Sequence, residues 1–479
     1  MKESIPGVKL PRSKQRWEDA NLYFKVRLPI DSSTTIEDID SYALNMQEII
    51  YDYFASSEGT VKTPEIGSFG EKYKNHSVKQ LKRELAVLKS NKTDGDEIRF
   101  VSRLIRQSIK RQNSSDVCHN IESQLSKSFW KTCKKIFNTT ENALPSFDIV
   151  TCHKYFKQAL SQVRKYKVFK VPTWLMQLHD PTINFKMDPP SYQEVARAVR
   201  RGKSRASPCP LDQISVIALK KCPQLRTALH HLLVACWSKA RLPECWKHSL
   251  SILLHKKGET SDPSNFRPIT LEPVLYKIYA TILRDRLFNF ISDNNYIDTK
   301  CQKGFWRGID GVAEHSQLLN HIIKDAKRHQ RSLFVTLIDL RNAFGEIHHN
   351  LIKCALSFHH VPEHITNIVT DIYTHSYIHV ANNGQLTTRV AVERGVLQGD
   401  VCSPILFNMC TNILMVTIAT PKYQQFGYMW GPNAGLRSSA WLQFADDTAL
   451  IAQSIEGAQA LLSTCVAWSH WADMQIRID

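Results

Sequence analysis

The chain has 479 residues, of which 43% are hydrophobic and 22% charged, and this composition excludes a wholly disordered, collagen-like or proline-rich protein. Lysine and arginine number 62 against 45 aspartate and glutamate residues, so the net charge is +17. An excess of that size favours a polyanionic partner, most often a nucleic acid.

Neither the start of the chain nor its most apolar stretch predicts a membrane protein. The first residues lack the apolar core of a signal peptide, and residues 403–419 are interrupted by Asn408, Thr411 and Asn412, which predicts a buried helix. The 12 cysteines form no C-x-x-C pair, so we expect reduced thiols in an intracellular protein and no zinc finger.

The basic excess is concentrated in residues 71–170, which carry 22 lysine and arginine residues against 9 aspartate and glutamate residues. Residues 1–70 before it have only weak patterns. Within the basic region, residues 76–111 have apolar side chains at helical spacing on both sides of a turn signal at 91–95. These apolar residues are Val78, Leu81, Leu85, Leu88, Ile98, Val101, Ile105 and Ile109.

This pattern predicts a helical hairpin, and two interpretations of its charges stay open. Its cationic face could bind nucleic acid through Lys82, Arg83, Arg103 and Arg106. The same charges could equally form a solvated helix surface.

From about residue 171 a proline-punctuated linker precedes a mixture of helices and short strands. We expect helices at residues 192–201, 213–221, 225–239 and 274–291. Short β-rich runs are predicted at residues 249–255, 333–339, 378–381 and 442–450.

Two of these runs contain candidate catalytic carboxylates. Residues 332–339 (SLFVTLID) are almost continuously apolar, which predicts a buried central strand that ends in Asp339. Residues 441–452 (WLQFADDTALIA) predict a β-hairpin with Asp446 and Asp447 at its tip.

Taken singly, these aspartates have ordinary interpretations: Asp446 and Asp447 could form a solvated turn, and Asp339 could cap a helix. If the strands are neighbours, the carboxylates meet at one sheet edge, where like charges oppose joint ionisation unless cations are present. Mg²⁺ prefers oxygen ligands and substrate phosphates. Clustered carboxylates in a basic chain therefore suggest phosphoryl transfer on nucleic acid.

Five ordered motifs carry a resemblance to a known family. F-A-D-D at 444–447 and Asp339 followed by Ala343–Phe344 resemble motifs C and A of reverse transcriptases, and residues 394–408 (RGVLQGDVCSPILFN) resemble motif B. Upstream, residues 254–271 (LHKKGETSDPSNFRPITL) and 301–308 (CQKGFWRG) are similar to the fingers motif and the Q-x-G-F element. The particular residues of these motifs resemble those of non-LTR (LINE-type) retrotransposons.

The resemblance implies an α+β fold, the fingers and palm of a right-hand polymerase, in which helices pack on an antiparallel sheet. It places the linker and start of the fingers at 171–235 and the fingers and palm at 236–479, after the basic helical N-terminal region. It also implies that the chain stops inside a motif-D-like segment, WSHWADMQIRID, without a thumb.

Roles follow position by position from the same resemblance. Asp339, Asp446 and Asp447 would be catalytic and, with the Leu340 carbonyl, would hold two Mg²⁺ ions, with Mn²⁺ as a substitute. The nucleotide-binding candidates are Lys256, Lys257, Arg267, Phe344, Gln398 and Gly399. Phe344 would lie beneath the nucleotide sugar and exclude a 2′-hydroxyl, although a core aromatic is the alternative interpretation.

Some positions depart from the family pattern: Phe444 replaces the commoner tyrosine, Gly345 replaces a frequent acidic residue, and residues 207–212 (SPCPLD) replace a more glycine-rich stretch.

The expected function is RNA-directed DNA polymerisation by a nucleotidyltransferase, with an RNA template, a DNA primer or target DNA, and dNTPs as partners. No membrane is expected, no protein partner can be inferred from the sequence, and a nuclear location follows only by analogy. Two alternatives stay open: a truncated, inactive RNA- or DNA-binding remnant, and a protein resembling group II intron maturases.

Overall fold

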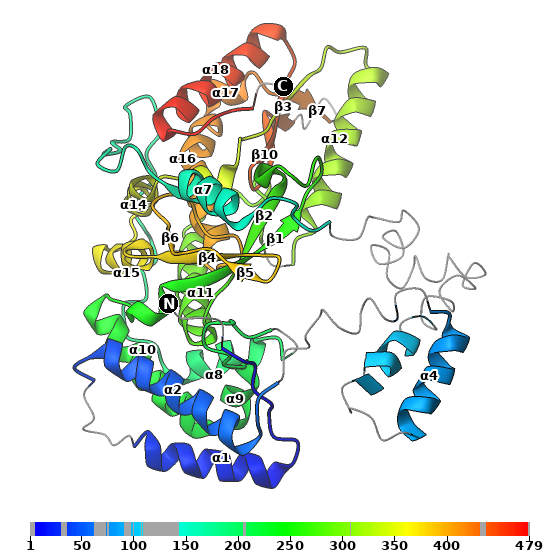
Figure 1. Cartoon of the computed structure of the whole chain (residues 1–479). Helices are drawn as coiled ribbons and strands as arrows, with labels where there is room; N and C mark the ends of the chain where they lie inside the picture. Colours follow the sequence, from blue (N-terminus) through cyan, green and yellow to red (C-terminus); the bar gives the residue numbers. More distant parts are fainter. Residues whose placement is uncertain are drawn as a thin grey trace. The chain divides into compact units, whose positions relative to one another are not determined.

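The computed structural model describes residues 5–29, 36–61, 73, 76–90, 97–98, 100–106, 108, 143–204, 207–306, 308–431 and 437–477. The chain divides into two compact units. Residues 1–60 and 144–479 form the larger unit, and residues 61–143 form the smaller one. The architecture is mixed α+β, with the sheets in the C-terminal half and helices towards the N-terminus (Figure 1).

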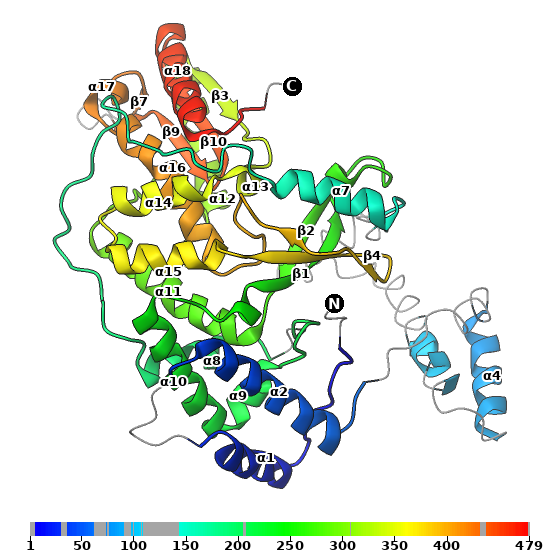
Figure 2. The same ribbon diagram turned by 60° about the vertical axis from the view of Figure 1, so that its left-hand side comes forward.

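Two N-terminal helices, which the sequence analysis did not predict, belong to the larger unit. Helix α1 (Lys14–Arg27) begins at an N-cap serine, and α2 (Ile39–Ser57) begins at an N-cap aspartate. Both pack against α10 (Pro223–Lys239), beside which they lie in Figures 1 and 2. They bury Phe24 and Phe54 in the main core. The burial of these apolar side chains therefore holds α1 and α2 against α10.

The helices predicted after residue 190 are present. They are α8 (Tyr192–Arg201), α9 (Val216–Lys221), α10 and α11 (Val274–Asp293). Helix α9 begins three residues later than predicted, because Gln213 has a left-handed backbone with φ +52° that cannot continue a right-handed helix.

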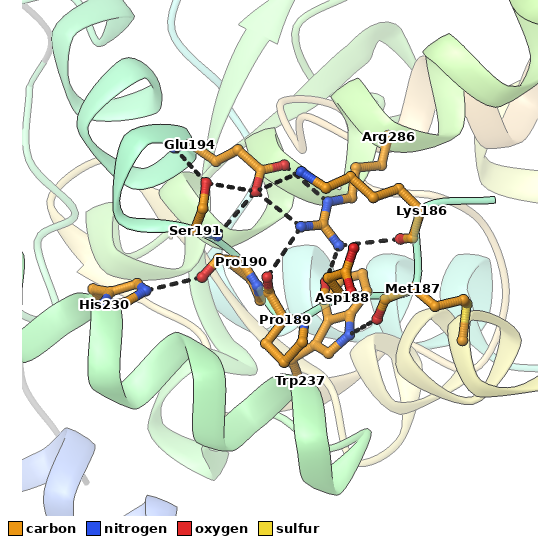
Figure 3. Close-up of polar contacts among 10 residues, drawn as sticks. All are labelled: Lys186, Met187, Asp188, Pro189, Pro190, Ser191, Glu194, His230, Trp237 and Arg286. Carbon is orange, nitrogen blue, oxygen red and sulfur yellow. Dashed lines mark hydrogen bonds and ion pairs between the residues drawn. The ribbon is translucent and has the colours of Figure 1, made fainter. Parts of the chain in front are cut away.

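A buried arginine, Arg286, joins α8, α10 and α11 (Figure 3). Arg286 of α11 donates from Nε and Nη2 to the two carboxylate oxygens of Glu194 in α8, at 3.0 and 2.9 Å, and from Nη1 to the Asp188 carbonyl at 2.5 Å. Its guanidinium lies 4.5 Å from the ring centroid of Trp237 in α10. Burial alone would raise the pKa of Glu194, but the hydrogen bonds and charge of Arg286 and the Ser191 cap lower it to about 2.

The first sheet has five strands in the order β2-β1-β4-β5, with β6 also paired to β4. These strands are β1 (His248–His255), β2 (Phe266–Leu271), β4 (Tyr377–Asn382), β5 (Gln385–Leu386) and β6 (Val390–Ala391). Strands β1 and β2 are antiparallel, whereas β1 and β4 are parallel. The sheet therefore carries the fingers-motif hairpin and ends just before the motif-B-like segment.

Helix α7 (Ile149–Leu160) packs on β4 and β6, and the chain after it crosses the larger unit. Arg164 pairs with Asp473 at 3.0 Å, and Lys165 pairs with Glu393 at 2.5 Å. These two cations of the predicted basic region are thus used in ion pairs within the fold.

The second sheet is antiparallel and has three strands in the order β3-β10-β9: β3 (Phe334–Ile338), β10 (Asp447–Ala452) and β9 (Trp441–Phe444). The prediction of a buried central strand at 332–339 was wrong, because β3 is an edge strand of this sheet, with Leu337 77% exposed. A continuous apolar run cannot distinguish burial on both faces from apolar exposure on one face.

The remaining helices of the C-terminal half are α12 (Gly311–Arg328), α13 (Ala343–Glu346), α14 (His349–Phe358), α15 (Glu363–Tyr373), α16 (Ser403–Ile418), α17 (Pro421–Gln424) and α18 (Ile455–Ala472), of which α12 and α18 pack on this sheet. A short hairpin of β7 (Tyr428–Trp430) and β8 (Arg437–Ser439) lies between α17 and β9 in the chain. Helix α16 is buried along nearly its whole length, as predicted. Over the described ranges, every helix is too short or too polar to span a bilayer.

The smaller unit contains α4 (Val78–Ser90) and a helical stretch at residues 97–98 and 100–106. Leu81 and Leu88 of α4 share a small core with Val101 and Ile105, which agrees with the predicted apolar faces. The predicted turn at 91–95 and Ile109 lie outside the described residues.

Candidate active site

The second sheet brings the three predicted catalytic aspartates together. Thr448 of β10 pairs with Ile338 of β3, so Asp339 follows β3 at the end of the sheet where Asp447 begins β10. Asp447 also pairs with Phe444 of β9, so the turn between β9 and β10 consists of Ala445 and Asp446. The predicted hairpin tip is therefore shifted by one residue.

The electrostatics of Asp446 show how close these carboxylates are. Burial raises the pKa of Asp446, and the negative charges of Asp447 and Asp339 raise it further, while Arg267 opposes the shift. Asp446 is half-buried, whereas Asp447 is exposed. Asp339 and Asp447 are thus near enough for their charges to act on Asp446, and so is Arg267.

A glutamine side chain holds the turn that carries Asp446. The Oε1 atom of Gln302 accepts hydrogen bonds from the backbone N–H groups of Ala445 at 2.9 Å and Gly304 at 2.8 Å. Asn408 of α16 donates to the Gly304 carbonyl at 3.0 Å. A Cβ at Gly304 would lie 2.4 Å from the Ala445 nitrogen, so the Q-x-G spacing requires glycine at this close approach.

Cationic side chains lie on the hairpin of β1 and β2. Arg267 is exposed on β2 and pairs in register with Leu254, and Lys256 and Lys257 are exposed just after β1. Loss of hydration lowers the pKa of Lys256, and the positive charges of Arg267 and Arg477 lower it further. Lys256 and Arg267 therefore lie in one cationic group, whereas Lys257 has no comparable link to it among the described residues.

Phe344 is half-buried in a group of aromatic rings. Its ring stacks on Phe407 of α16, with centroids 4.6 Å apart and planes 4° apart. Its other neighbour is Phe305 at 6.0 Å, and Phe305 lies 6.3 Å from Phe444. Phe305 is 50% exposed and has φ +66°, a strained backbone for a bulky residue. Aromatic rings thus extend from Phe344 to the hairpin of β9 and β10.

The motif-B-like loop lies against the end of β2. The Gln398 carbonyl accepts a hydrogen bond from the Thr270 N–H at 2.7 Å. Gly399 has φ +120°, and a Cβ there would lie 2.5 Å from the Thr270 carbonyl oxygen. Both the backbone conformation and the close approach therefore require glycine at this position.

The departure at Gly345 also has a structural reason. Gly395 has φ +81°, and a Cβ there would lie 2.8 Å from the Gly345 carbonyl. A Cβ on Gly345 would itself lie 2.3 Å from the Asn342 side chain. The start of the motif-B-like segment therefore packs directly on the turn after Asp339, where a side chain at 345 would meet Asn342.

Lys82, Arg83, Arg103 and Arg106 all lie in the smaller unit. All four side chains are exposed, and Arg106 donates from Nε to the Ser102 carbonyl at 3.2 Å. Exposure agrees equally with a solvated surface and with a nucleic-acid-binding face, so the structure leaves both interpretations open.

The sequence analysis did not predict two contacts of the site. Gln302 contacts the turn that carries Asp446, and Arg477 pairs with Asp339. The Q-x-G-F motif contained the signal for Gln302. Arg477 donates from Nη1 to Asp339 Oδ2 at 2.8 Å, and no motif pointed to it.

The donor set fits divalent cations chemically, since carboxylate and backbone carbonyl oxygens are the ligands of Mg²⁺. Burial raises the pKa of Asp446, and the charges of Asp447 and Asp339 raise it further, so a bound cation would relieve the repulsion among these carboxylates. Within the described ranges, however, no three acidic, histidine or cysteine side chains are already grouped for metal binding. Leu340 is buried and pairs with Ile476 as an isolated bridge.

Comparison with known proteins agrees with this geometry. Residues 254–479 match the family described as reverse transcriptase (RNA-dependent DNA polymerase), whose members generally use divalent metals. The chain is 30% identical over 46% of its length to a "Retrovirus-related Pol polyprotein from type-1 retrotransposable element R2" of Nasonia vitripennis. It is 28% identical over 58% of its length to a protein of the same description from Popillia japonica.

A third relative aligns over more of the chain. The "Probable RNA-directed DNA polymerase from transposon X-element" of Drosophila melanogaster is 23% identical over 74% of the chain. The alignments cover 20%, 36% and 39% of these three relatives, so the chain spans well under half the length of each. Residues 254–479 are a reverse transcriptase domain, distantly similar to the polymerases of the R2, jockey and X-element non-LTR retrotransposons.

Proposed function

We propose that this chain is the RNA-directed DNA polymerase of a non-LTR retrotransposon, copying element RNA into DNA. In the proposed reaction, a primer 3′-hydroxyl oxygen attacks the α-phosphorus of a dNTP, a phosphodiester bond forms, and pyrophosphate leaves. The observation that carries the proposal is the cluster of Asp339, Asp446 and Asp447 at one end of an antiparallel sheet, with Arg267 acting on it.

The aspartates are proposed to bind cations. Asp339, Asp446, Asp447 and the Leu340 carbonyl would hold two Mg²⁺ ions, or Mn²⁺, which polarise the hydroxyl and neutralise the leaving group when bound. The pairing of β3 with β10 and the tight turn at Ala445 and Asp446 would hold the carboxylates on regular elements, so that little reorganisation is needed when charge develops.

The residues around the cluster are proposed to bind the nucleotide. Arg267 would donate a planar fork to triphosphate oxygens, and Lys256 and Lys257 would add point charges. Phe344, held by its stack on Phe407, would lie against the sugar and disfavour a 2′-hydroxyl. The loop at Gln398 and Gly399 would lie beneath the new base pair, because its glycine allows close approach.

Membership of the reverse transcriptase family implies binding of a nucleic-acid template and primer. We propose an RNA template and a DNA primer or target DNA, recognised mainly through phosphates and duplex shape. The exposed cations of the smaller unit would add sequence-independent affinity. Insertion into chromosomal DNA would require the chain to act in the nucleus.

Primer extension on a primed RNA template with Mg²⁺ tests the proposal. We expect Asp446→Asn, which keeps the shape of the side chain but removes its charge, to lower incorporation by about 1,000-fold or more while RNA binding is retained. Asp180→Asn is the matched control, because this carboxylate is 99% exposed on the segment before α8.

Equal incorporation by native protein and Asp446→Asn would contradict the assignment of Asp446. Absence of incorporation by the native chain, with RNA binding intact, would favour the inactive RNA-binding remnant.

A further inference from the structure

Arg477 is bound to the catalytic Asp339 through both its backbone and its side chain. Its N–H donates to the Asp339 carbonyl oxygen at 2.8 Å, and its Nη1 donates to Asp339 Oδ2 at 2.8 Å. The ion pair is about half-exposed, with 51% of the arginine side chain and 46% of the aspartate side chain accessible. One carboxylate oxygen of Asp339, a proposed metal ligand, therefore already accepts a hydrogen bond from a guanidinium.

The backbone sets this position. After α18 the chain runs antiparallel to the segment that follows β3, with Ile476 opposite Leu340 and the Arg341 N–H bonded to the Gln475 carbonyl at 2.8 Å. This pairing places residue 477 beside residue 339, so the arginine reaches the carboxylate without a long flexible loop.

Arg477 also lies close to the proposed triphosphate-binding residues. Its charge and that of Arg267 both act on Lys256, and Arg267 in turn acts on Asp446. Two cations of the hairpin of β1 and β2 and one from the segment after α18 thus lie near one another beside the carboxylates. Like charges gathered in this way repel one another, and a polyanion that binds several of them relieves the repulsion.

We propose that Arg477 is a further nucleotide-binding residue that, in the substrate-free protein, neutralises Asp339 in place of a divalent cation. When a cation binds Asp339, the guanidinium is released and donates to the phosphates of the incoming nucleotide together with Lys256 and Arg267. This inference rests on the proposed polymerase function.

The exchange is feasible because the pair is exposed. Half-exposed ion pairs contribute little free energy, so a divalent cation can displace the guanidinium at low cost. A guanidinium presents several donors in a plane, which suits it to carboxylate and phosphate oxygens alike.

Mn²⁺ binding, followed by electron paramagnetic resonance without nucleotide, tests the first half of the proposal. We expect Arg477→Gln to bind Mn²⁺ about two- to five-fold more tightly than the native chain, since the competing ion pair is weak. Arg477→Lys should stay near the native affinity. Arg341→Gln is the matched control, because it removes the same charge from an exposed side chain two residues from Asp339.

Mn²⁺-dependent binding of a fluorescent dATP analogue tests the second half. We expect Arg477→Gln to weaken this binding about ten-fold, the effect of losing one charge-assisted hydrogen bond, and Arg477→Lys to restore part of it. Thermal unfolding of each variant shows whether the fold is retained.

The two proposals fail in different ways. Mn²⁺ binding to Arg477→Gln that is no tighter than to Arg341→Gln, or an unchanged nucleotide affinity, would overturn the role of Arg477. If native protein and Arg477→Gln bound no more Mn²⁺ than Asp446→Ala, the metal-dependent polymerase function would be overturned and this inference with it.

Discussion

The side-chain amide of Gln302 forms two hydrogen bonds with the backbone of Ala445, accepting from its N–H at 2.9 Å and donating to its carbonyl at 3.3 Å. Ala445 has φ +57°, a left-handed conformation that costs a non-glycine residue about 1 kcal/mol or more. Gln302 is 2% exposed, so the amide replaces water as the partner of this strained turn. The direction of the Asp446 carboxylate therefore depends on a residue far away in the sequence.

Gln302→Ala should lower the kcat for nucleotide incorporation by about 100-fold, because a small displacement of a catalytic group has an effect of that order. The lost hydrogen bonds should also lower the free energy of unfolding by about 1–3 kcal/mol. Single-nucleotide incorporation kinetics and urea denaturation measure the two effects.

Gln459→Ala, on the exposed face of α18, is the control for glutamine truncation. A stability loss in Gln302→Ala with unchanged kcat would limit Gln302 to a structural role.

Phe344→Ala should relax discrimination between dNTPs and rNTPs by roughly 10–100-fold, since a filled apolar pocket distinguishes small groups by factors of this size. Phe344→Tyr should retain discrimination because the ring remains. The ratio of kcat/KM for dCTP and CTP on the same primed template measures the effect.

Phe290→Leu is a control for loss of aromatic packing, because Phe290 is buried against Phe185 and Tyr296. Phe344→Ala could leave the dNTP/rNTP ratio unaltered and lose stability as Phe290→Leu does. That result would show that Phe344 only packs in the core and does not select the sugar.

Glu194 should make the stability of the larger unit depend on pH in the acid range. Its folded pKa of about 2 lies below the ordinary value of 4.5, so its stabilisation is complete above about pH 4.5 and is lost as pH falls towards 2. At pH 7, Glu194→Gln should cost about 3 kcal/mol because it leaves Arg286 buried without its charge partner.

Urea denaturation at pH 7 and pH 3 measures this dependence, and the difference between native protein and Glu194→Gln should shrink at the lower pH. Glu456→Gln, an exposed carboxylate in the first turn of α18, is the control. An equal difference at both pH values would show that packing, and not the charge of Glu194, carries the stabilisation.

Replacing Lys82, Arg83, Arg103 and Arg106 together by glutamine should flatten the salt dependence of single-stranded RNA binding. If all four contact phosphates, the slope of log K against log salt should fall by about 3, at roughly 0.7 per neutralised charge. Fluorescence anisotropy over a range of KCl concentrations measures the slope.

A matched set on α1 and just before it removes the same charge from exposed positions: Arg12, Lys14, Lys25 and Arg27. An identical slope for native protein and the variant in the smaller unit would show that its cations are merely solvated.

Much of the local structure was predictable because its signals are local. Helices α8, α10 and α11 and strands β1 and β4 were expected within one or two residues, since apolar periodicity and turn residues define them. Helices α1 and α2 were missed, because their apolar residues bury themselves against α10, and short-range periodicity was too weak to show it.

The sequence by itself determined the motifs that resemble reverse transcriptases and the identity of the candidate carboxylates, because side-chain chemistry is a property of single residues. Only the tertiary structure decided that β3 is an edge strand, that Gln302 supports the turn at Ala445, and that Arg477 occupies Asp339. These relationships depend on strand pairing between distant segments. No local pattern encodes which backbone will lie beside which carboxylate.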